Sequence, residues 1–229
     1  MGKRIRVAFV VLLALGLPTL GPSCKRADSA AGSGGAGAAA APASGGFGLG
    51  EEESGPPPAI SDGHWTFDPG HVFVLFKARH FGAGYVYGMF KETTGSVTLD
   101  SADPSKNRVE MIIQAGSLET FNGRRDEHLR GPDFLNAVQF PTLSVRSSSL
   151  AREPDGTWTA AGELTIRGTS KTVTLRARPL AEVDDPMGKR RAAFETSFVI
   201  PRLEYGVSFM PEAFGHDVFV LVAVEATKD

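Results

Sequence analysis

Segments with the alternation of β-strands follow one another from residue 65 to residue 226, and no helix-sized segment separates them. Val109, Met111 and Ile113, for example, alternate with polar residues, as in a half-buried strand. Closing long antiparallel strands into a barrel removes their exposed edges. We therefore predict an all-β fold, an antiparallel β-barrel of about eight strands. The expected strands are 65–67, 71–81, 85–90, 95–99, 108–114, 142–150, 157–166, 172–178, 192–200 and 216–226.

Several of these strands are apolar on both faces, so something must cover each face. The two coverings that fit are an ordinary core with a packed helix, or a lipophilic cavity inside the barrel. The pattern favours neither, because a single-residue bulge exchanges the inner and outer faces. In 71–81, Val72, Val74, Phe76, Ala78 and His80 alternate with Phe73 and Leu75. In 85–90, Tyr85, Tyr87 and Met89 alternate with Val86 and Phe90. In the last strand, Val218, Val220, Val222 and Val224 share one face.

The charged segment 124–141 interrupts the strand pattern. Thr120, Asn122 and Asp126 can cap a short helix, which we place near 122–137 over one mouth of the barrel. We expect Arg125 and Asp126 to pair and His128 to be hydrogen-bonded there.

The same segment also fits an acid/base or metal cluster, because a carboxylate can orient an imidazole. The alternative function is thus an envelope hydrolase or metal-binding protein that uses His80 and His128, with His71 as a further candidate. No second cluster has metal-ligand spacing, and no Gly-x-Ser-x-Gly or phosphate-loop motif occurs. We therefore favour a structural role and predict no catalytic residue, no metal site and no enzyme activity.

The first 24 residues have the features of a secretory signal. Lys3, Arg4 and Arg6 precede the apolar run 7–17, which is too short to cross a bilayer as a helix. Cys24 is the only cysteine, so it is a free thiol, an intermolecular bridge or a lipid attachment point.

The position of Cys24 resembles the lipobox of bacterial lipoproteins, in which the cysteine is acylated. Ser23 fits this pattern, whereas Gly21 stands where leucine is usual and Pro22 is unusual. We expect a periplasmic lipoprotein anchored to a membrane through Cys24, the outer membrane rather than the inner one. The alternative is cleavage at another small residue, which leaves a soluble periplasmic protein.

Residues 25–60 are rich in Ala, Gly, Ser and Pro and cannot bury enough apolar surface to fold. We predict a disordered tether there, spanning roughly 30 to 35 Å, followed by one barrel domain at 61–229. The chain has 24 Lys and Arg against 26 Asp and Glu, a formal net charge of −2. Interspersed charges of this balance argue against nucleic acid as a partner.

Four ordered motifs resemble the YceI-like family: Trp-Thr-Phe-Asp-Pro-Gly-His at 65–71, Ser-Leu-Glu-Thr-Phe-Asn-Gly-Arg-Arg-Asp-Glu-His-Leu at 117–129, Gly-Glu-Leu-Thr-Ile-Arg-Gly-Thr-Ser-Lys-Thr-Val at 162–173 and Arg-Leu-Glu-Tyr-Gly at 202–206. Val72 departs from the serine usual in the family, and Cys24 is absent from many relatives. The resemblance implies an extended lipocalin-like β-barrel, exported to the periplasm, whose apolar lumen holds a long isoprenoid such as a polyprenyl chain or quinone.

This resemblance favours the cavity over the filled core. We expect the protein to sequester or transport the isoprenoid, with no other cofactor, and a homodimer stays open. Aromatic and methionine side chains suit contact with a bent apolar chain. The residues expected to line or gate the cavity are Phe76, His80, Tyr85, Tyr87, Met89, Phe134, Phe140 and Phe209.

Overall fold

A computed structural model describes residues 55–229 of the chain. The predicted signal peptide 1–24, with Cys24, and most of the predicted tether lie outside the described residues. The strands are β1 (Gly63–His80), β2 (Gly84–Phe90), β3 (Thr93–Leu99), β4 (Arg108–Gln114), β5 (Leu118–Glu119), β6 (Thr142–Arg152), β7 (Trp158–Ile166), β8 (Thr169–Asp184), β9 (Arg190–Pro201) and β10 (Phe214–Lys228). The helical elements are η1 (Pro104–Lys106), η2 (Ala115–Ser117), α1 (Gly123–Arg130) and η3 (Arg202–Tyr205).

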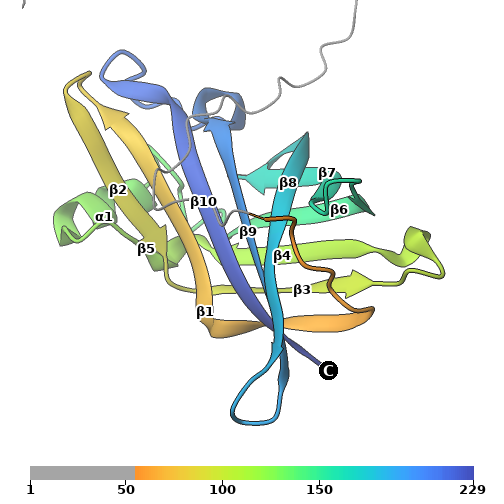
Figure 1. The fold of residues 1–229 in the computed structure, drawn as a ribbon. Coiled ribbons are helices and arrows are strands. Elements are labelled where there is room, and N and C mark those ends of the chain that lie inside the picture. The colour runs from red at the N-terminus through yellow and green to blue at the C-terminus, as the bar shows by residue number, and fades with distance from the viewer. Residues whose placement is uncertain (1–54) are drawn as a thin grey trace, which may run out of the picture. The chain divides into compact units, whose positions relative to one another are not determined.

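Eight of these strands form a closed antiparallel ring (Figure 1). Their order is β10, β9, β8, β7, β6, β4, β3 and β1, and β1 pairs with β10 to close the ring. β2 continues the sheet from β1, and β5 pairs with β2. The structure therefore confirms the predicted all-β barrel of about eight strands with a short helix in the region 122–137.

β1 is a single long strand that bends in its middle. Its first part, at 63–66, pairs with β3, whereas its last part, at 74–80, pairs with β2. The register against β10 shifts between Phe67 and Val72. Pro69 and Gly70 lie in this interval, and both residue types are typical of bulges because proline donates no N–H and glycine has no side chain to pack. This bulge explains why the sequence pattern predicts two separate strands.

The bend separates two ends of the barrel. We call the end where β1 pairs with β3 the Trp65 end, and the end where β1 pairs with β2, next to α1, the α1 end. Trp65 is 0% exposed and donates its indole N–H to the carbonyl oxygen of Ser61 at 3.1 Å. Pro57 and Ile60 are also buried. Both residues were predicted to lie in a disordered tether. The structure corrects this prediction for 55–60, because the apolar side chains of Pro57 and Ile60 pack against the barrel.

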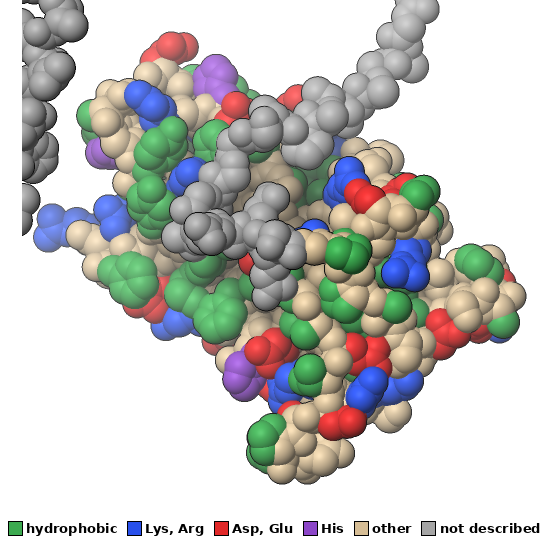
Figure 2. All heavy atoms as spheres, viewed as in Figure 1, with side chains coloured by type: hydrophobic (Ala, Val, Ile, Leu, Met, Phe, Trp, Pro, Cys, Tyr) green, Lys and Arg blue, Asp and Glu red, His purple; other side chains and the backbone are tan. Residues whose placement is uncertain are grey.

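Ion pairs surround the Trp65 end. Arg191 donates to Asp68 at 2.7 Å, to Glu225 at 3.0 Å and to Asp185 at 3.3 Å. The hydrogen bond from Arg191 is the main reason why the pKa of Asp68 is lowered to about 2. Figure 2 shows acidic and basic side chains interspersed in the lower part of the view, where the turn between β8 and β9 projects. These contacts tie β1, β9 and β10 together at this end.

Candidate functional site

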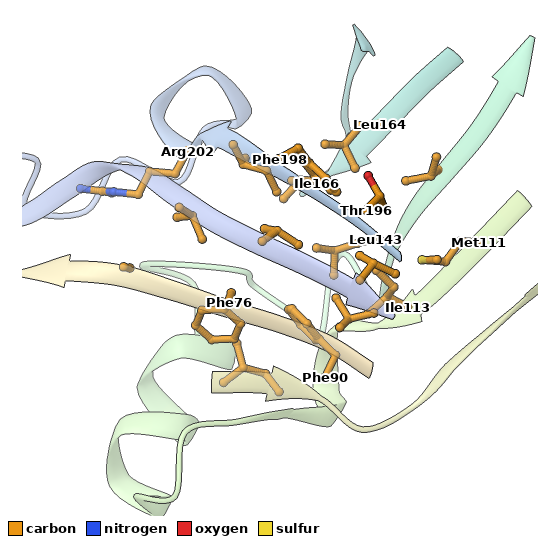
Figure 3. Close-up of a pocket in the computed structure, with 18 of the residues that line it drawn as sticks. Phe76, Phe90, Met111, Ile113, Leu143, Leu164, Ile166, Thr196, Phe198 and Arg202 are labelled. Carbon is orange, nitrogen blue, oxygen red and sulfur yellow. The ribbon is translucent and has the colours of Figure 1, made fainter. Parts of the chain in front are cut away.

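A cavity of about 700 Å³ lies inside the barrel. Every strand of the closed ring contributes to its wall, which is almost entirely apolar. Binding sites for small molecules have volumes of roughly 300 to 1,000 Å³ and similarly apolar walls. Figure 3 shows wall residues from different strands that point into the same space, among them Phe76, Phe90, Met111, Ile113, Leu143, Leu164, Ile166 and Phe198.

The alternation of the strands builds this wall. On β10, Val218, Val220, Val222 and Val224 all line the cavity, so the apolar face identified in the sequence is the inner face. β1 contributes its even-numbered residues from Val74 to His80, and β9 contributes Phe194, Phe198 and Ile200. The bulge in β1 changes which residues face inward: the odd-numbered Trp65 and Phe67 are buried before it, and the even-numbered residues line the cavity after it.

Three of the eight predicted lining residues are in the cavity wall: Phe76, His80 and Phe134. Phe76 lies opposite Gly88 on β2. A Cβ atom at position 88 would stand 2.4 Å from the Phe76 ring, so glycine is needed there for Phe76 to take its position in the wall. Whether these three residues contact a ligand stays a prediction.

Tyr85, Tyr87 and Met89 do not line the cavity, which corrects the prediction for these residues. They alternate with Val86 and Phe90, which do line it. Tyr85 and Tyr87 are 41% and 54% exposed on the outer face. Figure 2 shows hydrophobic side chains gathered on the side of the molecule where β1 and β2 lie.

Phe140 and Phe209 also lie outside the cavity wall. The Phe140 ring packs against the turn between β7 and β8, where a Cβ atom on Gly168 would stand 2.7 Å from it. Phe209 belongs to the loop before β10, and its ring lies 5.3 Å from that of Phe134. Phe209 is therefore placed behind a wall residue, where it can support the mouth without lining it.

Asn122 caps α1, as predicted: its side-chain oxygen accepts a hydrogen bond from the backbone N–H of Arg125 at 3.1 Å. The buried carboxylate of Asp126 accepts bonds from the N–H and the hydroxyl of Thr120, at 2.8 and 2.5 Å. Arg125 donates from Nε to the Thr120 hydroxyl at 2.7 Å and from Nη2 to its carbonyl at 2.6 Å. The predicted pair of Arg125 and Asp126 is wrong, because adjacent helical residues point in different directions and both bind Thr120 instead.

Five aromatic rings meet at the α1 end, and we call them the mouth cluster: His80, His128, Phe134, Phe209 and Phe214. The His128 ring lies 5.1 Å from that of Phe134, which lies 5.8 Å from Phe214. The Phe214 ring in turn lies 5.5 Å from His80. His128 Nε2 is 2.9 Å from the Asp133 carboxylate, in agreement with the predicted hydrogen bond. The cluster joins three segments: the end of β1, residues 128–134, and residues 209–214 at the start of β10.

Arg202 holds this loop in place. It is 5% exposed, and its guanidinium donates to four backbone carbonyls, those of Val207, Phe209, Phe214 and Gly215, at 2.5, 3.2, 3.0 and 2.8 Å. Burial lowers the pKa of Arg202 from its ordinary value. Arg202 belongs to the motif 202–206 that resembles the family, but no role was predicted for it. Its burial could not be expected from the sequence, because arginine is seldom fully buried.

The described residues contain no group of three or more His, Cys, Asp or Glu side chains arranged to hold a metal ion. His71 lies away from the mouth, where its Nδ1 is 3.0 Å from Asp68. Within 55–229, no helix combines the length and apolar character needed to cross a membrane.

Residues 65–226 match the family model described as the YceI-like domain. Protein YceI of Salmonella arizonae is 34% identical over 158 residues, which cover 69% of this chain and 82% of that protein. Protein YceI of Salmonella heidelberg shows the same identity and coverage.

Solved structures with a similar fold include BcnA of Burkholderia cenocepacia, with a TM-score of 0.63 and 20% identity over 70% of this chain and 99% of that chain. A YceI protein of Campylobacter jejuni has a TM-score of 0.57 and 24% identity over 66% and 90%. A polyisoprenoid binding domain from Saccharophagus degradans has a TM-score of 0.54 and 12% identity over 74% and 100%. These structures share the lipocalin-like barrel fold, and by the family match and the Salmonella relatives this chain belongs to the YceI-like family.

Proposed function

We propose that this protein binds a long isoprenoid, a polyprenyl chain or an isoprenoid quinone, in the cavity of its barrel, and that it sequesters or transports this lipid. The observation that carries the proposal is the apolar cavity of about 700 Å³ enclosed by eight strands. Each CH₂ group removed from water contributes about 0.8 kcal/mol, so a long chain gains more than a short one until the cavity is full. The polyisoprenoid binding domain of the same fold is consistent with this ligand.

The α1 end offers a route for a lipid to enter. Asn122, Arg124 and His128 line the cavity and are also exposed, so the cavity reaches the surface between them. The mouth cluster surrounds this route with rings from three separate segments. His80 and Phe214 are paired across β1 and β10, whereas His128 and Phe134 meet the other rings through side-chain contacts and can part from them without breaking a strand. A chain entering here would pass the cluster before it meets the wall residues of the strands.

The binding function is favoured over the hydrolase or metal protein that the histidines suggest. His80 and His128 both belong to the mouth cluster, but no third ligand completes a metal site with them in the described residues. The wall beside His80 is apolar and suited to a hydrocarbon chain. A hydrolytic activity that is lost in His80→Gln or His128→Gln, with stability unchanged, would favour the enzyme instead.

We further propose that the protein is exported and anchored through Cys24, which lies outside the described residues. The short apolar run before Cys24 and the flexible composition after it support this proposal. A diacyl group gives stable attachment where a single short chain is marginal. Cys24→Ser should therefore move the protein from the membrane pellet to the soluble fraction; an unchanged pellet fraction would contradict the anchor.

Binding can be tested with lipid-free protein and polyprenols of increasing length. Affinity should rise with the number of prenyl units and level off at the cavity length. Phe76→Asp should abolish binding, because a carboxylate facing the apolar cavity loses its hydration without a partner. The matched control is Phe73→Asp on the outer face of the same strand, where the side chain is 45% exposed and the lipid should still bind. Equal affinity for all chain lengths, or equal effects of the two variants, would contradict the proposal.

A further inference from the structure

The hairpin of β1 and β2 carries positive charge on its outer face and has no carboxylate of its own. Residues 69–91 contain no Asp or Glu. Arg79 donates to the neutral carbonyl of Gly82 at 2.7 Å, and the Lys77 ammonium lies 5.4 Å from the centre of the Tyr85 ring. A carbonyl and an aromatic ring hold these cations in place without cancelling their charges.

Apolar side chains project at the tip of this hairpin and next to it. Phe81, at the tip, is 59% exposed, and Met210, in the loop before β10, is 48% exposed. The N–H of Phe81 donates to the carbonyl of Ala213 at 2.7 Å, so the two segments are joined, and Figure 1 shows them projecting together. The loop also brings Glu212, and β10 brings Asp217, both exposed. The positive charge is therefore confined to the hairpin.

The backbone at both apolar residues is unusual. Phe81 and Met210 have φ values of 50° and 40°, in the left-handed region that bulky side chains rarely adopt. Gly82 follows Phe81 with a φ of 68°, and a turn with two such residues favours Asn or Gly at the first position. The fold alone would be served better by a smaller residue. A large apolar side chain at such a position indicates a role outside the fold.

The outer face of the hairpin is ordered in layers behind the tip. Arg79 lies opposite Tyr85, and Lys77 lies opposite Tyr87. At 3.3 Å per residue, these pairs stand roughly 7 and 13 Å behind Phe81. The head-group layer of a bilayer is roughly 5 to 8 Å thick. Tyrosine rings favour this layer, and Lys and Arg side chains reach its phosphates. Figure 2 shows hydrophobic side chains gathered on this side of the molecule.

The Trp65 end also exposes apolar side chains, but it lacks this arrangement. Met187 is 82% exposed in the turn between β8 and β9, and Val183 near the end of β8 is 48% exposed. Asp184 and Asp185 lie between them in the sequence. An anionic surface would repel these carboxylates, so this end is the natural control.

We propose that the hairpin docks the α1 end on the surface of an anionic phospholipid bilayer. Phe81 and Met210 enter below the head groups, and Lys77 and Arg79 meet the lipid phosphates. A bilayer fits two separate projecting tips because a fluid surface needs no matching shape. His80, next to the tip, lines the cavity, so docking sets the cavity mouth against the membrane. The inference extends the proposed function, since a lipid then passes between bilayer and cavity without crossing water.

The chain that precedes the described residues is long enough for this orientation. The described chain begins at Gly55, whose carbonyl accepts a hydrogen bond from Arg178 on β8 at 2.9 Å. β10 has 15 residues, roughly 50 Å of strand. The 30 residues between Cys24 and Gly55 can span at most roughly 100 Å. An anchor at Cys24, as proposed above, therefore permits the α1 end to face the same membrane.

Tryptophan reporters locate the docked end. The full-length protein carries Cys24→Ser, so that no acyl group attaches it, and it is mixed with vesicles of phosphatidylcholine and phosphatidylglycerol that contain brominated chains as quenchers. Phe81→Trp keeps an aromatic ring at the tip, and its fluorescence should shift to shorter wavelength and be quenched. Met187→Trp is the matched control and should show neither change. Trp65 and Trp158 are buried and give the same background in both proteins.

Removing the ring at the tip should weaken docking and spare the fold. Phe81→Gly suits the positive φ, so the melting temperature should stay close to that of the wild type. Its affinity for the same vesicles should fall roughly tenfold or more, because an inserted phenyl ring is lost. Met187→Gly removes an exposed apolar side chain at the other end and should leave the vesicle affinity unchanged.

The two cations are tested by neutralising them together. Lys77→Gln with Arg79→Gln should lower the affinity for vesicles that contain phosphatidylglycerol roughly tenfold or more, and should leave the weaker affinity for pure phosphatidylcholine unchanged. Arg152→Gln with Lys189→Gln is the matched control, because both residues are exposed at the Trp65 end and the net charge changes by the same amount. This control should bind the vesicles as the wild type does.

Several results would overturn the proposal. Quenching that is equal in Phe81→Trp and Met187→Trp, or absent from both, would show that the hairpin does not enter the bilayer. An unchanged vesicle affinity in Phe81→Gly would remove the role of the tip, and equal effects of the two charge pairs would remove that of Lys77 and Arg79. The isoprenoid affinity of the cavity is measured without vesicles. Docking can therefore fail while isoprenoid binding holds, and a docked protein that binds no isoprenoid would overturn the proposed function alone.

Discussion

The two ends of the barrel use arginine in different ways. At the Trp65 end, Arg191 contacts three carboxylates and Arg190 contacts two, so their charges are neutralised. At the α1 end, Arg125, Arg130 and Arg202 donate to hydroxyl or carbonyl oxygens. A neutral acceptor fixes the position of a guanidinium without cancelling its charge. The first end is therefore arranged to hold strands together, whereas the second also keeps positive charge beside the cavity.

The two ends of the barrel also differ in what fills them. The fully buried Trp65 and the buried Ile60 fill the first end. The second end is covered by α1 and by rings from three segments, of which 128–134 meets the strands of the ring through side-chain contacts. Segments held by few backbone hydrogen bonds open at a lower free energy than strands in a closed sheet. Ligand entry at the α1 end is thus compatible with a stable barrel.

Removing the buried arginine should have the largest effect on stability. Arg202→Met leaves four backbone carbonyls, one buried and three partly buried, without their donor, and we expect the free energy of unfolding to fall by about 3 to 5 kcal/mol. Chemical denaturation measures this change. Arg202→Lys keeps the charge but cannot reach all four carbonyls, so it should recover only part of the loss. A change below about 1 kcal/mol in Arg202→Met would show that these bonds do not hold the loop.

Removing the buried carboxylate of Asp126, at the α1 end, should have the second-largest effect on stability. Asp126→Ala leaves the N–H and hydroxyl of Thr120 unpaired, which should cost about 2 to 3 kcal/mol and lower the melting temperature. Both bonds end on Oδ1, so the amide oxygen of Asp126→Asn can still accept them, and this variant should cost less. If the two variants have the same stability, the contacts with Thr120 are not the source of the effect.

An acid titration should show how much an ion pair of the Trp65 end contributes to the stability of the fold. The pKa of Asp68 is about 2 in the folded protein, below its usual 3.8, so its ion pair with Arg191 stabilises the fold above about pH 4 and is lost as the pH falls towards 2. We expect Asp68→Asn to lower the free energy of unfolding by about 1 to 2 kcal/mol near neutral pH. The difference from the wild type should shrink to nothing near pH 2. A difference that does not depend on pH would rule out the ion pair as its cause.

The smallest effect is expected at an exposed ion pair of the α1 end. Lys171 and Glu204 lie 3.0 Å apart, with side chains 37% and 56% exposed. Solvent screens such pairs, so Lys171→Gln should change the free energy of unfolding by less than about 1 kcal/mol. A larger fall in the free energy of unfolding, measured by chemical denaturation, would mean that surface ion pairs, and not buried contacts, stabilise this end.

Much of the fold could be predicted from the sequence, because the alternation of apolar and polar residues has the period of a strand. The four valines of β10 indicate one apolar face, but alternation alone does not say whether that face points inward. The bulge at Pro69 and Gly70 decides the question for β1, and its effect depends on pairing with a strand distant in the sequence. Tyr85 and Tyr87 were predicted on the wrong face because the register of β2, which places them opposite Arg79 and Lys77 of β1, cannot be seen in the sequence.

The α1 end was harder to predict because its contacts join distant segments. The cap at Asn122 is local and could be predicted, as could a hydrogen bond to His128. The partners of Arg202 are backbone carbonyls of the loop before β10, and the path of that loop is not encoded in a residue pattern. Arg125 and Asp126 are neighbours in sequence, yet the helix turns them towards Thr120 from different sides.

The central claim, that the barrel holds an isoprenoid, is tested most directly by the lipid that accompanies the protein. The protein is purified from the cells that produce it naturally and extracted with organic solvent, and the extract is analysed by mass spectrometry, with Phe76→Asp as the empty control. The account predicts an isoprenoid in the wild type and its absence in the variant. An extract without any isoprenoid, or the same lipid in equal amount in both proteins, would contradict it.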